Sequence, residues 1–408
     1  MNSTTAVSVV VIATAAVIAP LLAELLRKWR VPSVLFELLL GILIGPAVLG
    51  WVTVDEFVGN LSVFGLAILF FMAGYEIDFE KLRGAPIKRG LIGWALSLTI
   101  GLGVGVALAL EGVVLSSLLV GLALTTTAIG ALLPMLHDRG MLDSPFGSFV
   151  TAAGAIGEFG PIVAITILLS AGSPFRESVL LLVFAGLAVA VAGLASRPQP
   201  PAFIEMMQRH LSTSTQLPVR IILLLLTIMV MLATTLGLDS LLGAFAAGII
   251  VRLALSPDES AALSPRLEAI GFGFLIPIFF IVSGVNFDLD SLLNSRSAML
   301  KVPMFLGLML LIRGVPALLV YRGVMTLRER AAMTVLQATA LPLLVVITQI
   351  GLDTHRMKPE NAAALVGAGM LSVLVFPLVG FGILGASKLA GDEVVNAAQG
   401  EALGPLRD

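Results

Sequence analysis

The segment Phe70–Leu82, FFMAGYEIDFEKL, recurs 210 positions later as Phe280–Leu292, FIVSGVNFDLDSL. Both copies have an apolar start, a central glycine (Gly74 and Gly284) and acidic residues after it. Two weaker echoes occur in the same order: Thr127-Ala128 with Thr339-Ala340, and Pro161 with Pro377. The pattern indicates an internal duplication. The alternative is chance similarity between apolar segments.

The composition predicts an all-α polytopic membrane protein. Hydrophobic residues make up 58% of the chain and charged residues 12%, about half the charge of an average soluble domain. The chain has no cysteine, which excludes disulfides, thiol catalysis and Cys-ligated metals. The net charge of −2 does not indicate a nucleic-acid partner, and none is expected. The first apolar run is long enough to be a retained helix rather than a cleaved signal.

Apolar runs of spanning length recur along the whole chain. We predict thirteen spans: Val7–Leu26, Ser33–Leu49, Leu61–Tyr75, Gly90–Leu110, Val114–Leu136, Phe146–Ala171, Ser178–Leu194, Pro218–Leu236, Leu241–Leu255, Leu267–Ser283, Ala298–Val320, Ala331–Gly351 and Asn361–Leu384. This count places five Lys and Arg residues on the side of the N-terminus, eighteen on the other side and Arg313 within a span. The positive-inside rule then puts the N-terminus outside and the C-terminus in the cytoplasm, across the cytoplasmic (inner) membrane.

The duplicated segment predicts how the two halves are related. Its copies end the third and tenth spans, which are seven spans apart and therefore cross the membrane in opposite directions. We predict inverted six-helix repeats at about 7–171 and 218–384, joined by a helix at about 178–194. Secondary transporters with such repeats bind their substrates where helices are interrupted near the middle of the bilayer.

Two spans carry features of interrupted helices. Thr125, Thr126 and Thr127 lie in the middle of one span, and Thr339 and Pro342 lie in the middle of its repeat mate. Proline has no N–H group, so it removes one backbone hydrogen bond from a helix. Threonine forms helices poorly, and its hydroxyl can replace a lost backbone partner. The alternative is a kinked but continuous helix whose threonines bond to their own turn.

Glu158 lies in the apolar run Phe146–Ala171, which has no other charge. A carboxylate at the bilayer centre costs from about 2.5 to more than 10 kcal/mol, so the default interpretation is an ion or proton site. Pro161 frees the carbonyl oxygen of Gly157, and hard oxygen ligands suit an alkali cation. The alternative is a neutral, hydrogen-bonded glutamate that ties helices together.

Arg313 also lies near the middle of a span. Arginine stays protonated in proteins, so it is a poor proton carrier. We expect it to balance charge, either by neutralising the negative ends of interrupted helices or by pairing with Glu158. The alternative is an arginine that snorkels to the interface.

The chain resembles the monovalent cation:proton antiporters, the broad class of Kef-type potassium/proton and bacterial sodium/proton exchangers, and is cation:proton antiporter-2-like. The resemblance covers nearly the whole chain. It is carried by 31–46 (VPSVLFELLLGILIGP), 71–78 (FMAGYEID), 125–128 (TTTA), 243–248 (GAFAAG) and 277–280 (PIFF).

The resemblance implies a thirteen-helix fold with two crossing broken helices and elevator-like alternating access. It implies core helices at about 90–171 and 298–384, and dimerisation helices at about 7–75 and 218–283, so a homodimer is expected. Glu158 falls at the position of the family's ion-binding acid, with Thr126, Thr127 and Gly157 beside it. Arg313 falls where the family often has Lys or Arg.

One departure from the family bears on stoichiometry. Family members commonly carry Asn-Asp or Gln-Asp at this site, whereas Gly157 precedes Glu158 here. With one titratable group, the proton and the cation would compete for a single charge, which predicts electroneutral exchange. Only about 24 residues follow the last predicted span, so we expect no C-terminal nucleotide-binding domain in this chain.

These observations together predict exchange of Na⁺ or K⁺ for H⁺ in a lipid membrane, without a cofactor. One alternative is a sodium-coupled symporter of an organic anion on a similar fold. Another is an uncoupled cation channel or sensor. A membrane enzyme is not expected, because no nucleophile–base pair or metal-ligand set lies at midplane depth.

Overall fold

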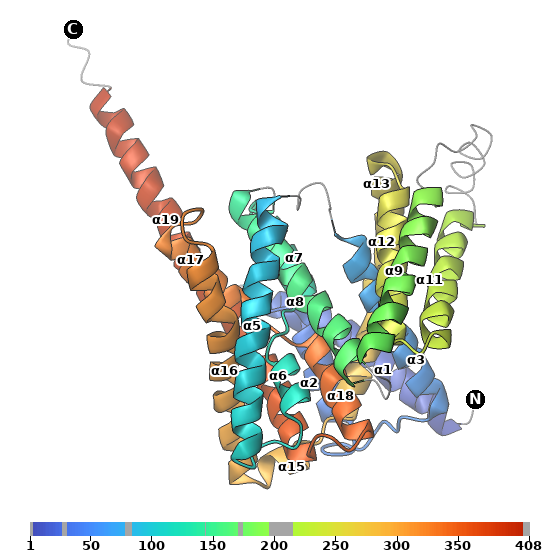
Figure 1. Cartoon of the computed structure of the whole chain (residues 1–408). Helices are drawn as coiled ribbons and strands as arrows, with labels where there is room; N and C mark the ends of the chain where they lie inside the picture. The colour runs from blue at the N-terminus through green and yellow to red at the C-terminus, as the bar shows by residue number, and fades with distance from the viewer. Residues whose placement is uncertain are drawn as a thin grey trace. The chain divides into compact units, whose positions relative to one another are not determined.

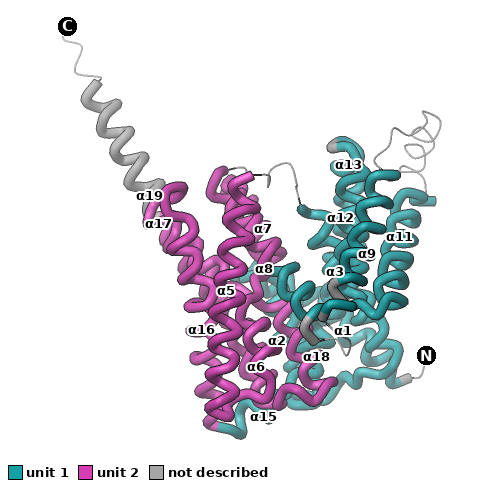
Figure 2. The backbone as a smooth tube through the Cα atoms, viewed as in Figure 1, with its two compact units in different colours: residues 1–83, 158–295 teal, residues 84–157, 296–408 magenta. Residues whose placement is uncertain are grey.

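The computed structural model describes residues 3–26, 31–77, 84–142, 144–169, 174–195 and 215–402. Within these ranges every regular element is a helix, as Figure 1 shows. The chain divides into two compact units (Figure 2), which are described separately below. Residues 78–83, which include Asp78 and Glu80 of the first repeated segment, lie outside the described residues.

Unit 1 consists of Met1–Arg83 and Glu158–Ser295. Its helices are α1 (Ser3–Leu25), α2 (Ser33–Ile44), α3 (Glu56–Tyr75), the second part of α8 (Pro145–Leu169), α9 (Pro174–Ala195), α11 (Leu217–Thr235), α12 (Ser240–Ala254), α13 (Pro257–Ile270), the π-helical turn η2 (Gly271–Leu275), α14 (Ile276–Val285) and α15 (Leu289–Leu293).

Glycines allow the helices of unit 1 to approach closely. A Cβ atom on Gly41 of α2 would lie 2.1 Å from the carbonyl oxygen of Ile281 in α14. A Cβ atom on Gly248 of α12 would lie 2.0 Å from the carbonyl oxygen of Phe71 in α3. Small residues permit such backbone contact between membrane helices.

Unit 2 consists of Gly84–Gly157 and Arg296–Asp408. Its helices are α5 (Ala85–Leu110), α6 (Ser117–Ala123), α7 (Ile129–Asp138), the first part of α8, α16 (Arg296–Val320), α17 (Leu327–Gln337), α18 (Pro342–Asp353) and α19 (Pro359–Ala402). A buried apolar cluster built from α7, α8, α16, α17 and α19 forms part of its core.

The described helices account for the predicted number of spans. Nine helical segments of the described chain are long and apolar enough to cross a membrane. Three shorter apolar helices, at Ser33–Ile44, Val179–Leu194 and Ser240–Ala254, and the interrupted pair α6–α7 bring the membrane segments to thirteen. The predicted all-α polytopic fold with about thirteen helices is therefore confirmed.

The end predicted for the last span, Leu384, agrees with the apolar segment, which ends at Gly385. Helix α19 itself continues to Ala402, because hydropathy marks the thickness of the bilayer rather than the end of a helix. One predicted start is wrong. The tenth span does not begin at Leu267. A polar helix starts at Pro257, where Ser256 and Glu259 form a capping box.

Candidate functional site

The first interruption lies in unit 2 between α6 and α7. Helix α6 ends at Ala123 and α7 begins at Ile129 (Figure 1). The Thr125 hydroxyl donates to the carbonyl oxygen of Leu122 at 2.8 Å, and the Thr126 hydroxyl donates to that of Ala123 at 2.8 Å. The backbone N–H groups of Thr125 and Thr126 donate to the same two carbonyl oxygens, so each hydroxyl adds a second hydrogen bond at the end of α6.

The second interruption lies between α17, which ends at Gln337, and α18, which begins at Pro342. Ser372 of α19 holds this segment in place. Its hydroxyl lies 3.0 Å from the backbone N–H of Ala340, which donates to it, and 3.0 Å from the carbonyl oxygen of Ala340. Sequence analysis missed Ser372, because a single serine in an apolar helix gives no sign of a long-range partner.

The two interruptions contact each other, and we call residues 124–128 and 338–341 together the helix crossing. The N–H of Ala128 donates to the carbonyl oxygen of Thr339 at 2.7 Å. The Thr127 hydroxyl donates to the carbonyl oxygen of Gln337 at 2.6 Å. The Thr127 N–H donates to the carbonyl oxygen of Gly157 at 3.1 Å. The carbonyl that Pro161 was predicted to free is thus bound by the first interrupted segment.

Arg313 of α16 lies beside the helix crossing with 1% of its surface exposed. Its Nε donates to the Thr127 hydroxyl at 2.9 Å and to the carbonyl oxygen of Gln337 at 3.3 Å. Its Nη1 donates to the Ser97 hydroxyl and its Nη2 to the carbonyl oxygen of Ala153, both at 3.3 Å. All four acceptors are uncharged. Because Gln337 is the last residue of α17, the guanidinium faces the negative C-terminal end of that helix, where a cation is stabilised.

Gly157 leaves the space that Arg313 and Thr127 fill. A Cβ atom at this position would lie 2.5 Å from Nη2 of Arg313 and 2.7 Å from the Thr127 hydroxyl oxygen. Real Cβ atoms essentially never make contacts under 3.0 Å. A side chain at position 157 is therefore incompatible with the observed position of Arg313.

Glu158 follows Gly157 in α8 and has 4% of its surface exposed. Helix α8 continues through Pro161 to Leu169. Within unit 1, Phe159 stacks on Phe245 of α12, with ring centroids 4.1 Å apart. This stacking fixes the turn of α8 that carries the carboxylate.

One buried polar atom of the helix crossing, Oγ1 of Thr339, has no hydrogen-bond partner. The side chain of Thr339 is fully buried, although its backbone N–H donates to Leu336 and its carbonyl oxygen accepts from Ala128. Buried polar groups are rarely left without a partner.

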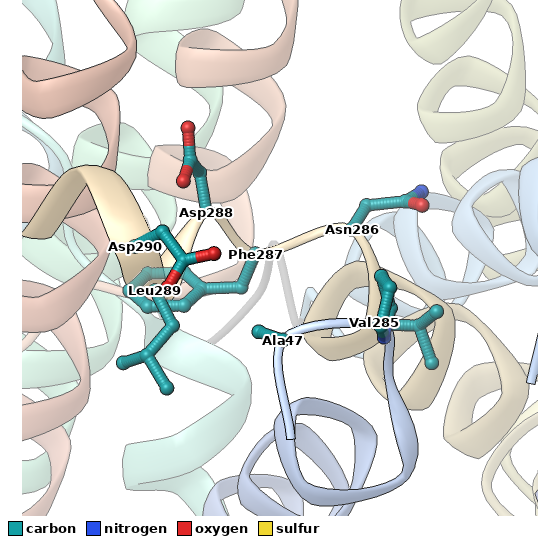
Figure 3. A pocket seen from close by; sticks show the side chains of 8 residues that line it. Ala47, Val285, Asn286, Phe287, Asp288, Leu289 and Asp290 are labelled. Atoms are coloured by element: carbon teal, nitrogen blue, oxygen red, sulfur yellow. The ribbon is translucent and has the colours of Figure 1, made fainter. Parts of the chain in front are cut away.

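A pocket of about 390 Å³ lies elsewhere, at the end of α14 in unit 1. It is lined by Pro46, Ala47, Val285, Asn286, Phe287, Asp288, Leu289 and Asp290. Its polar side chains point in different directions (Figure 3), and Asp288 accepts from the N–H and hydroxyl of Ser291. We interpret its acidic side chains as surface and capping groups. Among the described residues, no three His, Cys, Asp or Glu side chains are grouped to hold a metal ion.

Comparison with known proteins places these features in a family. Residues 12–384 match the family described as "Sodium/hydrogen exchanger, transmembrane". The chain is 25% identical over 394 residues to the putative Na(+)/H(+) antiporter YjbQ of Bacillus subtilis, covering 93% of this chain and 63% of that protein. It is also 25% identical to the probable Na(+)/H(+) antiporter 3 of Methanocaldococcus jannaschii, covering 87% of this chain and 91% of that protein.

A solved structure shares the fold. The sodium proton antiporter MjNhaP1 from Methanocaldococcus jannaschii matches with a TM-score of 0.64 at 16% identity, over 92% of this chain and 96% of that one. A likeness at this identity shows the fold alone. Because the family match covers nearly the whole chain, this protein belongs to the transmembrane sodium/hydrogen exchanger family.

Proposed function

We propose that the protein exchanges a monovalent cation, Na⁺ or K⁺, for H⁺, and that both bind in turn to Glu158. The observation that carries this proposal is a buried carboxylate placed directly after Gly157, whose carbonyl oxygen is bonded to the first interrupted helix. The names of the two relatives as Na(+)/H(+) antiporters support the type of reaction. A carboxylate accepts either a proton or a cation, and in each case its charge is neutralised.

The ligands around the cation are proposed to be neutral oxygens. The Thr126 hydroxyl donates its proton to the carbonyl oxygen of Ala123 and keeps its lone pairs for a cation. The Thr127 hydroxyl already accepts from Arg313 and donates to Gln337. We therefore propose that Thr127 and Gly157 shape the helix crossing, and that Thr126 is a direct ligand.

Exchange is proposed to be electroneutral. Arg313 stays protonated and uses its donors on four neutral acceptors, so it adds a fixed charge rather than a titrating one. Glu158 then supplies the one charge for which the proton and the cation compete. A current on a lipid-supported membrane, driven by the cation gradient, would contradict this stoichiometry.

We propose an elevator-type mechanism on the basis of the two compact units. Both interrupted helices, Arg313 and Gly157 belong to unit 2, and Glu158, the next residue of α8, would move with them. The dimerisation helices would lie in unit 1, at about 7–75 and 218–283. The protein would act as a homodimer in the cytoplasmic membrane, with the N-terminus outside.

The assignment of Glu158 is tested in proteoliposomes with a pH-gradient dequenching assay in Na⁺, K⁺ and Li⁺. Glu158→Gln should abolish exchange while leaving thermal unfolding in detergent unchanged. Glu37→Gln is the matched control, because Glu37 of α2 is also a buried carboxylate in a span. Retained exchange in Glu158→Gln would refute the assignment. Cation flux that persists without proton coupling would indicate a channel instead.

A further inference from the structure

The Thr339 hydroxyl stands apart from the other hydroxyls around the helix crossing. Those of Thr125 and Thr126 donate to carbonyls of α6, and that of Thr127 donates to Gln337. The hydroxyl of Ser372 is bonded to Ala340. The Thr339 hydroxyl oxygen has no partner, and the side chain is 0% exposed.

An unpartnered buried hydroxyl destabilises a fold, because its hydrogen bonds to water are lost without replacement. Valine has nearly the same shape and would not carry this cost. The backbone of Thr339 is already well bonded on both sides, so the hydroxyl is not needed to form the interruption. A ligand that binds during the transport cycle would satisfy the oxygen.

The surroundings favour a cation as that ligand. Thr339 follows the C-terminal end of α17, and the helix crossing also receives the C-terminal end of α6. Both ends carry partial negative charge, and that of α17 already faces Arg313. A hydroxyl oxygen is a neutral, hard ligand of the kind that suits alkali cations. Thr127, the repeat mate of Thr339, cannot serve in the same way because it lies against the guanidinium of Arg313.

We propose that the Thr339 hydroxyl is a direct ligand of the transported cation and helps to select it. This inference rests on the proposed exchange of a monovalent cation for H⁺. It assigns a ligand from the second interrupted helix, in addition to Thr126 from the first, and both threonines belong to unit 2. The cation would thus be held by oxygens from both halves of the internal repeat.

The test compares Thr339→Val with Thr339→Ser in proteoliposomes, with cation KM measured separately for Na⁺, K⁺ and Li⁺. We expect Thr339→Val to raise the KM of the preferred cation by about tenfold, the effect of losing about 1.4 kcal/mol of binding. Thr339→Ser should restore it. Thermal unfolding of Thr339→Val should be unchanged or shifted upwards, because no protein hydrogen bond is lost.

Thr348→Val is the matched control. Thr348 of α18 is buried, but its hydroxyl donates within its own helix, to the carbonyl oxygen of Val345 at 2.8 Å. This variant should keep the cation KM of the wild type. If Thr339→Val does not fold, Thr339→Ala takes its place, and its cation KM should rise in the same way.

The possible failures are distinguishable. An unchanged KM in Thr339→Val, with exchange lost in Glu158→Gln, would overturn the ligand role of Thr339 alone and leave a bound water as its partner. Retained exchange in Glu158→Gln would overturn the proposed function itself.

Discussion

Replacing Gly157 by alanine tests the packing beside Glu158. The added methyl group would lie 2.5 Å from Nη2 of Arg313, 2.7 Å from the Thr127 hydroxyl oxygen and 3.0 Å from Cβ of Thr127. Thr127 is held by two hydrogen bonds, from its N–H to Gly157 and from its hydroxyl to Gln337. Both side chains must therefore shift, Arg313 by the larger distance.

The cost follows from these contacts. To reach an ordinary contact distance of 3.4 Å, Nη2 of Arg313 must retreat by about 0.9 Å, which breaks its 3.3 Å hydrogen bond to Ala153. Overpacking costs about 1–3 kcal/mol, and a lost bond to a charged group about 1.5–3 kcal/mol. Alanine regains about 0.5–1 kcal/mol of helix stability. We expect a net loss of about 1.5–5.5 kcal/mol in unfolding free energy.

The measurement is thermal unfolding in detergent, followed by tryptophan fluorescence, with exchange measured in proteoliposomes. Gly157→Ala should unfold at a lower temperature and exchange more slowly. Gly103→Ala is the control, because a Cβ atom on Gly103 of α5 meets nothing within 4 Å. Its unfolding temperature should be unchanged or slightly higher.

A double-mutant cycle with Arg313→Lys identifies the partner of the added methyl group. Lysine lacks the forked head of arginine, so Gly157→Ala should cost less in the Arg313→Lys background than in the wild type. Strictly additive effects, or a Gly157→Ala protein as stable as the Gly103→Ala control, would refute the steric argument.

Two further predictions concern unit 1. Gly248→Ala should lower the unfolding temperature, because its Cβ atom would lie 2.0 Å from the carbonyl oxygen of Phe71. Gly59→Ala is the control and should not lower it, because its nearest contact is at 3.9 Å. Equal stability of the two variants would contradict the close approach of α12 to α3. The Thr5 hydroxyl and the Val58 N–H hold the pKa of Asp55 below its usual value of 3.8, so Thr5→Val should raise that pKa. A lowered pKa stabilises the fold above the usual value and loses this effect as the pH falls through the folded-state pKa. The wild type should therefore exceed Thr5→Val in unfolding temperature at pH 7, and the difference should shrink below pH 3.8; a gap that widens in acid would contradict the role of Asp55.

The helix interruptions were predictable because their causes are local. Pro342 removes one N–H group, and the run Thr125–Thr127 combines poor helix formation with hydroxyls that bond nearby carbonyls. The contacts around Arg313 were not predictable. Ser97 lies 216 residues away from Arg313 in sequence. Two other acceptors are the backbone carbonyl oxygens of Gln337 and Ala153, and a backbone carbonyl leaves no signal in the sequence because every residue has one.

The missed start of α13 had a local signal that hydropathy does not detect. Ser256 and Glu259 have the spacing of a capping box, and Pro257 occupies the first position of the helix. A search for caps as well as apolar runs would have extended this helix beyond the predicted span. The length of α19 had no comparable signal at Leu384, because the sequence there continues with residues that form helices.

The packing at position 157 gives a physical reason why no side chain precedes Glu158 on α8 in this chain. An Asn or Gln side chain at position 157 of this chain would begin with a Cβ atom 2.5 Å from Nη2 of Arg313. A side chain at position 157 and the observed placement of Arg313 are therefore mutually exclusive. The observed position of Arg313 therefore depends on this glycine. Introducing a second acid as Gly157→Asp should thus lower the unfolding temperature, because the new side chain cannot be packed beside Arg313. The loss should be smaller when Gly157→Asp is combined with Arg313→Lys.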